Sequence, residues 1–212
     1  MSGLLEGFRA LPSYGVGGVV VMLLHAVESE VRFGKRARTV FAGPSDRGST
    51  MAVALAAAVP VIGFVLACKA QTAAYHARLP AWLGRAGALP GMPVVAWAGV
   101  GVGVAGLLVR LWAVLALRER YTRTLLVMGH DHLIERGGPY RFVRHPGYLG
   151  SLLCLNGIAL ASGNAPVLTA SLLTTLAAYA YRIRVEDAML VDSFGAAYED
   201  YRHDVRALVP FF

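Results

Sequence analysis

The sequence predicts an all-α integral membrane protein with about five transmembrane helices, and three observations lead to this fold class. Of the 212 residues, 56% are hydrophobic and only 16% are charged, whereas soluble domains carry about 25% charged residues. Asp, Glu, Lys and Arg are absent from residues 10–27, 48–68, 86–109 and 146–181. Because a bilayer-spanning helix needs about 20 apolar residues, each segment can hold a span. This composition excludes a soluble enzyme, a disordered chain and a disulfide scaffold.

We expect helices over residues 11–27, 51–68, 94–117, 147–162 and 165–181. The last two come from one uncharged run of 36 residues, which as a single helix would extend about 54 Å, far beyond a hydrocarbon core of about 30 Å. The turn-forming run Ser162-Gly163-Asn164-Ala165-Pro166 predicts that the chain folds back there into a helical hairpin.

The distribution of Lys and Arg predicts the orientation of these spans. Residues 28–50, 118–146 and 182–212 contain 15 of these residues, and the segments on the other side contain 4. Cytoplasmic loops carry the positive excess, so we expect the N-terminus outside, with residues 118–146 and 182–212 in the cytosol. The net charge of +7 is explained by these loops. We therefore expect contact with membrane lipids, no nucleic-acid partner and no obligate protein partner. Without repeats or linkers, residues 1–212 are expected to form a single domain.

The C-terminal tail has its own pattern. Between residues 186 and 208, apolar residues recur every three or four positions: Leu190, Phe194, Tyr198, Tyr201, Val205 and Leu208. This spacing predicts an amphipathic helix, interrupted at Gly195, that lies on the membrane surface or packs against the cytosolic loop.

Polar residues concentrate in two segments, 130–148 and 181–187. Pro146 suits the first turn of a helix, which would put His145 beside backbone N–H groups able to bind an anion. Arg182 and Glu186 are four residues apart and can pair on one helix face. The predicted hairpin brings both segments to the same side. They form a site for a zwitterionic ligand, a site for a cationic ligand with an anionic substrate beside it, or a juxtamembrane charge belt with a surface ion pair.

These segments resemble the isoprenylcysteine carboxyl methyltransferases, and related phospholipid methyltransferases share the general pattern. The resemblance covers roughly residues 130–210. It rests on GPYRFVRHPGYLG at 138–150, Arg182-x-x-x-Glu186-Asp187 and Phe194-Gly195-x-x-Tyr198-x-x-Tyr201.

The resemblance implies a membrane methyltransferase that uses S-adenosylmethionine, held between the cytosolic loop and the C-terminal helix, and methylates a lipophilic acceptor. It assigns Arg182 to the substrate as the catalytic residue. Its implied cofactor contacts are His132, Leu133, Ile134, Glu135, Tyr140, His145, Pro146, Gly147, Tyr148 and Glu186.

The sequence departs from the family pattern at three points. Asp187 replaces a second Glu, which shortens its reach, and we expect it outside the cofactor contacts. Gly147 stands where a larger residue is common. The segment around His132 aligns in two registers one residue apart.

Three other features have competing interpretations. His130, Asp131, His132 and His145 are not accompanied by further ligands at metal-site spacing, so no metal is expected. Gly101-x-Gly103-x-x-Gly106 lies inside a span, which favours close helix packing over a cofactor loop, although approach by the adenosine end stays open. Arg110 either snorkels to the surface or serves a function inside the membrane.

The chemistry of the acceptor also stays open. A carboxylate, the acceptor that the resemblance favours, needs no general base, whereas a phospholipid amine or a phenolic lipid must lose a proton, which makes His145 or Glu186 the candidate base. Two further classes are a sterol-reductase-like enzyme that uses NADPH and a non-catalytic membrane protein.

Overall fold

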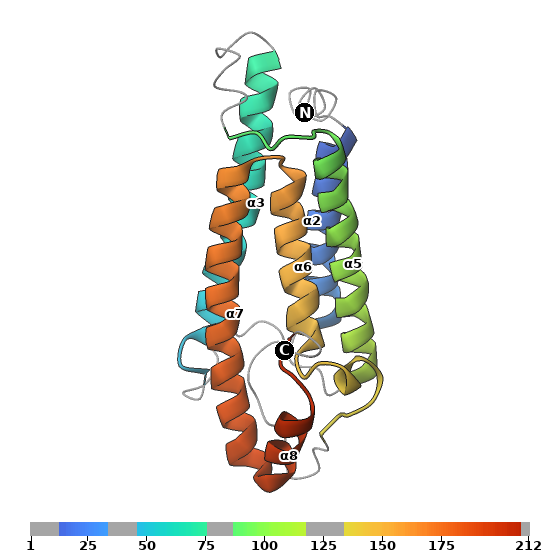
Figure 1. Ribbon diagram of the computed structural model, residues 1–212, viewed down its shortest axis with the longest axis vertical. Coiled ribbons are helices and arrows are strands. Elements are labelled where there is room, and N and C mark those ends of the chain that lie inside the picture. The colour runs from blue at the N-terminus through green and yellow to red at the C-terminus, as the bar shows by residue number, and fades with distance from the viewer. Residues whose placement is uncertain (1–12, 34–45, 76–86, 118–133, 209–212) are drawn as a thin grey trace.

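The computed structural model describes residues 13–33, 46–75, 87–117 and 134–208. Within these residues, five long helices run along an elongated bundle (Figure 1): α2 (Ser13–Phe33), α3 (Ser49–Tyr75), α5 (Val94–Leu117), α6 (Pro146–Ala161) and α7 (Ala165–Phe194). The 3-10 turn η4 (Gly138–Arg141) and the short helix α8 (Ala196–Asp204) lie together at one end. Each range predicted to be a span is helical where it is described, except that α6 ends at Ala161, one residue before the predicted end. The largest differences are at the C-terminal ends of α3 and α7, which continue for 7 and 13 residues past residues 68 and 181.

The outer surface of the bundle is apolar. The segments Ser49–Ala70 and Val94–Leu117 are long and apolar enough to cross a membrane, and Gly15–Val27 and Pro146–Ala161 are shorter apolar helices. Soluble monomers rarely expose large contiguous apolar patches. Here large apolar side chains point outward on four helices, among them Leu23, Leu55, Ile62, Leu108 and Leu173. An outer surface of this kind is typical of helices that face lipid.

The chain reverses direction between α6 and α7 at the predicted turn. Asn164 caps α7, its side chain accepting a hydrogen bond from the Val167 N–H at 3.2 Å. The Leu89 N–H donates to the Gly163 carbonyl at 2.7 Å, which ties this turn to the segment before α5. The turn therefore lies at one end of the bundle, while η4, α8 and the second half of α7 lie at the other (Figure 1).

Helices α5 and α6 pack backbone against backbone. A Cβ atom on Gly106 would lie 2.5 Å from the backbone nitrogen of Cys154, and one on Gly150 would lie 2.6 Å from that of Arg110. Gly101, by contrast, faces open space. Gly99 and Gly106 thus allow the close approach to α6 that small residues in a span predict, whereas the missing side chain of Gly103 makes room for Val21 of α2. A buried apolar cluster adjoins this contact between α2, α3 and α6: Val21, Phe64, Cys154, Ile158 and Ala161.

Buried polar side chains set the register of α7 against α6. The Ser171 hydroxyl donates to Asn156 Oδ1 at 2.8 Å, and Asn156 Nδ2 donates to the Thr175 hydroxyl at 3.1 Å. In an apolar setting such hydrogen bonds fix the register of two helices, because a one-residue shift would leave polar groups without partners. This register brings the polar part of α7 beside the beginning of α6.

Candidate active site

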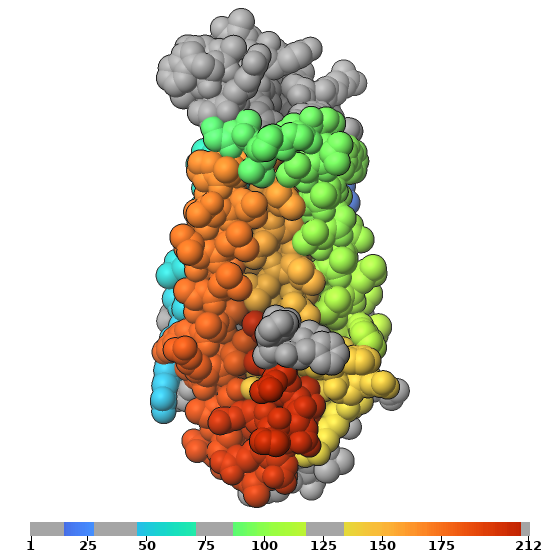
Figure 2. Space-filling view, viewed as in Figure 1, coloured from blue at the N-terminus to red at the C-terminus, as the bar shows by residue number. Residues whose placement is uncertain are grey.

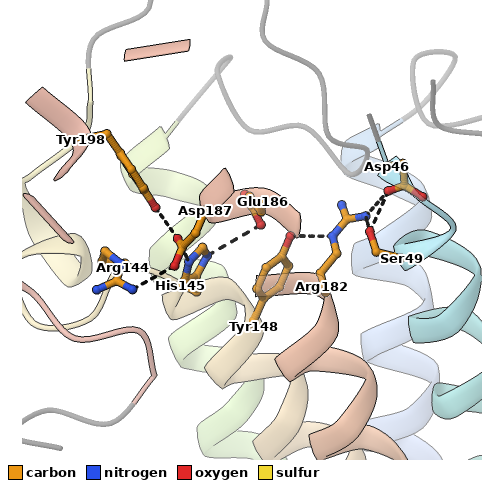
Figure 3. Close-up of polar contacts among 9 residues, drawn as sticks. All are labelled: Asp46, Ser49, Arg144, His145, Tyr148, Arg182, Glu186, Asp187 and Tyr198. Atoms are coloured by element: carbon orange, nitrogen blue, oxygen red, sulfur yellow. Dashed lines mark hydrogen bonds and ion pairs between the residues drawn. The ribbon is translucent and has the colours of Figure 1, made fainter. Parts of the chain in front are cut away.

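The candidate site lies where α6 begins and where α7 extends beyond the bundle. His145 is the N-cap residue of α6, and Pro146 occupies its first turn, where the missing N–H leaves no bond unmade. Arg182 and Glu186 share one face of α7. Figure 3 shows their side chains in a row with those of His145 and Tyr148. The structure thus brings together the two polar segments that the sequence singled out.

Asp187 is the centre of a buried polar cluster. Its Oδ1 lies 2.9 Å from His145 Nε2 and accepts a 2.6 Å hydrogen bond from the Tyr198 hydroxyl. Its Oδ2 accepts a 3.0 Å hydrogen bond from Arg144 Nη2. Burial alone would raise the pKa of Asp187, but the His145 and Tyr198 hydrogen bonds and the charge of Arg144 outweigh it and hold the pKa well below its usual range. Because the ionised carboxylate only accepts hydrogen bonds, His145 Nε2 carries the proton of their bond.

The same cluster connects the C-terminal segment to the residues that precede α6. Arg144 also donates to the carbonyls of Arg202 and Val205, and the Tyr201 hydroxyl donates to the Tyr140 carbonyl at 2.6 Å. Burial raises the pKa of Tyr201 to about 12, so this donor keeps its proton at physiological pH. Figure 2 shows α8 packed beside the segment around η4. The tail is helical on both sides of Gly195, which separates α7 from α8 as expected.

Glu186 differs from its neighbour because one of its oxygen atoms has no hydrogen-bond partner among the described residues. Glu186 Oε2 is buried and accepts no hydrogen bond there. His145 Nδ1 lies 3.7 Å from Glu186 Oε2, a distance longer than a hydrogen bond. The ring of His145 stacks on that of Tyr148, with centroids 5.4 Å apart and planes within 6°. A carboxylate oxygen and two stacked rings therefore converge on one place.

Arg182 is buried, with only 3% of its surface exposed. Its Nε donates to the Tyr148 hydroxyl at 2.9 Å. Its Nη1 lies 2.6 Å from Asp46 Oδ1, 2.9 Å from the Ser49 hydroxyl and 2.7 Å from the Thr50 hydroxyl. An arginine that was expected to meet a substrate is thus held by residues at the start of α3.

Sequence reasoning missed Asp46. Its carboxylate accepts hydrogen bonds from the Thr50 N–H and from the hydroxyls of Ser49 and Thr50, the pattern of an acidic residue at a helix start. Burial alone would raise the pKa of Asp46. These hydrogen bonds and the charge of Arg182 lower it by more, so the pKa lies below its usual value. An acidic residue before an apolar span indicates a helix start in the sequence. The pairing of Asp46 with Arg182, 136 positions away, is not indicated by any local pattern.

The remaining predicted residues are near the same end. Tyr140 and Gly147 are buried, and Pro146 is among the most fully buried side chains. Glu135 Oε1 accepts a hydrogen bond from the Gly137 N–H at 2.9 Å, and Ile134 is half-buried. His132 and Leu133, like His130 and Asp131, lie outside the described residues.

Arg110 points into the bundle. It is 8% exposed, and its Nη1 donates to the Ser151 hydroxyl at 2.6 Å, which in turn donates to the Gly147 carbonyl at 3.0 Å. Of the two interpretations of Arg110, snorkelling toward the surface is therefore wrong. The guanidinium instead lies inside the bundle, where its hydrogen bond to Ser151 connects it to the first turns of α6.

Comparison with known proteins agrees with this geometry. Residues 94–197 match the phospholipid methyltransferase family. A protein-S-isoprenylcysteine O-methyltransferase from Schizosaccharomyces pombe is 37% identical over 83 residues, which cover 38% of this chain and 34% of that protein. A probable protein-S-isoprenylcysteine O-methyltransferase from Oryza sativa subsp. indica is 30% identical over 118 residues, which cover 55% of this chain and 62% of that protein. The chain thus spans between a third and two thirds of the length of these relatives.

A solved structure has the same fold. The structure of the eukaryotic intramembrane Ras methyltransferase ICMT (isoprenylcysteine carboxyl methyltransferase) superposes with a TM-score of 0.58 at 24% identity, covering 74% of this chain and 52% of that one. The resemblance read from residues 130–210 is confirmed: this chain is similar in sequence to the isoprenylcysteine O-methyltransferases and shares the fold of the solved methyltransferase.

Proposed function

We propose that this chain transfers a methyl group from S-adenosylmethionine to a lipophilic acceptor at the cytosolic surface of the membrane. The proposed acceptor is a carboxylate of the isoprenylcysteine type. The match to curated methyltransferases supports the reaction class. The carboxylate oxygen of Glu186, buried without a hydrogen-bond partner among the described residues, is the single observation that carries the proposal.

A buried carboxylate oxygen without a hydrogen bond costs about 1–3 kcal/mol or more. A ligand that donates to Glu186 Oε2 removes this cost. S-adenosylmethionine fits, because it carries an ammonium group, ribose hydroxyls and a cationic sulfonium. The residues proposed to hold it with Glu186 are those already named: His132, Leu133, Ile134, Glu135, Tyr140, His145, Pro146, Gly147 and Tyr148. When bound, the cofactor supplies a methyl group on a positively charged sulfur.

The protein's part in such a reaction is mainly positioning. A carboxylate is already a nucleophile at neutral pH, so the chain has no proton to remove. Arg182 is proposed to orient the acceptor through its guanidinium, while the Asp187 cluster holds His145 and α8 in place around the cofactor. Holding both reactants in line, away from water, can supply most of the rate enhancement.

A second acceptor is favoured by one observation, the match to the phospholipid methyltransferase family. A phospholipid amine must lose a proton, and Glu186 is the candidate base, with His145 Nδ1 3.7 Å away. A carboxylate acceptor and an amine acceptor therefore predict different pH dependences, because only the amine requires deprotonation.

We further propose that residues 1–212 form one domain with five membrane spans and an external N-terminus. The polar end of the bundle carries Asp46, His145 and Arg182 (Figure 3), which come from the three segments expected in the cytosol. A site at this surface is open to S-adenosylmethionine from the cytosol and to a lipophilic acceptor from the bilayer.

Ligand-dependent melting in detergent tests the proposed function. We expect S-adenosylhomocysteine to raise the melting temperature and NADPH to leave it unchanged. The purified chain should then methylate a prenylated thioether carboxylic acid. Stabilisation by NADPH alone would indicate a reductase, and no response to either compound would indicate a non-catalytic membrane protein.

A further inference from the structure

Asp46 lies outside the segment that matches the methyltransferase family, yet it reaches the candidate site. The matched segment begins at residue 94, and Asp46 precedes α3. Its Oδ1 nevertheless lies 2.6 Å from Arg182 Nη1, with both side chains no more than 6% exposed. Figure 3 shows Asp46 and Ser49 at the end of the row, on the opposite side of Arg182 from Tyr148.

Three oxygen atoms meet one nitrogen of Arg182 at this point. Nη1 lies within 2.9 Å of Asp46 Oδ1 and of the hydroxyls of Ser49 and Thr50. The two hydroxyls in turn donate to Asp46 Oδ1. Because Tyr148 holds Nε from the α6 side, the plane of the guanidinium is fixed by contacts from two different helices. Arginine side chains carry about 2 kcal/mol of rotamer entropy. Because these contacts already hold the guanidinium in one geometry, less side-chain entropy is lost when an acceptor binds to it.

We propose that Asp46 is a positioning residue for methyl transfer: by pairing with Arg182, it orients the guanidinium toward the acceptor. This inference rests on the proposed function and assigns the start of α3 to the acceptor side of the site. Asp46 acts through Arg182 and does not take part in the cofactor contacts around Glu186. Loss of Asp46 should therefore slow methyl transfer to the acceptor and leave the affinity for the cofactor unchanged.

The test compares Asp46→Asn with wild type in two measurements. Asn keeps the shape and one acceptor oxygen but removes the charge. Loss of one charge-assisted hydrogen bond corresponds to about tenfold or more, so we expect kcat/KM for a prenylated thioether carboxylic acid to fall about tenfold, through kcat. The Kd for S-adenosylhomocysteine is expected to change by less than about twofold. Asp46→Glu should recover part of the activity, and Asp192→Asn, an exposed acidic residue on α7, serves as the matched control.

A double-mutant cycle separates positioning from a purely structural role. If Asp46 acts through Arg182, Asp46→Asn has little further effect on acceptor kinetics in the Arg182→Gln background, because the group that it orients is gone. Additive losses in the two backgrounds, or equal losses of acceptor turnover and cofactor affinity, would overturn the inference. A lower acceptor KM with unchanged kcat would also overturn it, since Asp46 would then compete with the acceptor for Arg182. If wild type neither binds S-adenosylhomocysteine nor methylates the acid, the proposed function fails first.

Discussion

The carboxylate of Asp187 accepts a hydrogen bond from His145 Nε2 at 2.9 Å. This bond joins α7, the second helix of the α6–α7 hairpin, to the residue at which that hairpin begins. Arg144 and Tyr198 bond to the same carboxylate. The two adjacent acidic residues of α7 thus differ in role. Asp187 binds protein groups, whereas one oxygen of Glu186 has no hydrogen-bond partner among the described residues and is the atom proposed to meet the cofactor.

Asp187→Asn should destabilise the protein in a pH-dependent manner. Removing one partner of a buried ion pair costs about 3–5 kcal/mol. The pKa of Asp187 is lowered in the folded state, so its stabilisation is fully present above the unfolded pKa of about 3.9 and is lost as pH falls below it. Thermal melting in detergent should therefore show a large gap between wild type and Asp187→Asn at pH 7 that narrows below about pH 4. A constant gap would show that ionisation of Asp187 is not the stabilising feature.

Gly106→Ala should weaken the contact between α5 and α6, whereas Gly101→Ala should not. The new Cβ atom at position 106 would lie 2.5 Å from the Cys154 backbone, but the one at position 101 meets nothing within 4 Å. Overpacking of this kind costs about 1–3 kcal/mol. The melting temperatures of the two variants measure the difference. Impaired S-adenosylhomocysteine binding by Gly101→Ala at unchanged stability would instead support a cofactor role for this glycine pattern.

The orientation can be tested by cysteine labelling of intact cells. Ser193 is exposed on the polar part of α7, and Ala88 is exposed at the opposite end of the bundle. With the N-terminus outside, a membrane-impermeant thiol reagent should modify Ala88→Cys in intact cells and Ser193→Cys only after permeabilisation. The reverse pattern would invert the topology and move the proposed cofactor site out of the cytosol.

Arg182→Lys should separate acceptor binding from cofactor binding. Lysine can keep the ion pair with Asp46 but lacks the planar fork that also reaches the Tyr148 hydroxyl and can hold a carboxylate with two bonds. Methyl transfer should slow, while the Kd for S-adenosylhomocysteine stays within about threefold, a change below ~1 kcal/mol. A parallel loss of turnover and cofactor affinity would remove Arg182 from the acceptor side.

Much of this architecture could be predicted because lipid exposure leaves a strong signal in the sequence. Uncharged runs located the helices, and Ser162 to Pro166 located the hairpin turn, since Gly163 and Asn164 favour a reversal. The same reasoning placed His145, Arg182 and Glu186 at one end. The break at Gly195 was predicted, but the continuity of α7 from Ala165 to Phe194 was not, because the helix continues beyond the uncharged run that marked the span.

The polar contacts between helices could not be predicted. The Asp46–Arg182 pair and the bonds from Asn156 to Ser171 and Thr175 depend on how the helices rotate against one another. Packing determines that rotation, and no local sequence pattern encodes it. The prediction that Asp187 lies outside the cofactor contacts remains a prediction, although the structure accounts for both of its oxygen atoms through protein groups.

Calorimetric titration of the purified chain with S-adenosylhomocysteine tests the central claim most directly. Wild type should bind saturably, and Glu186→Gln should weaken binding about tenfold or more, because one charge-assisted hydrogen bond is worth about 1.5–3 kcal/mol. The melting temperature of Glu186→Gln should stay near that of wild type, since Oε2 has no protein hydrogen bond to lose among the described residues, and Asp192→Asn should bind normally. No binding by folded wild type, or unchanged affinity in Glu186→Gln, would contradict this account.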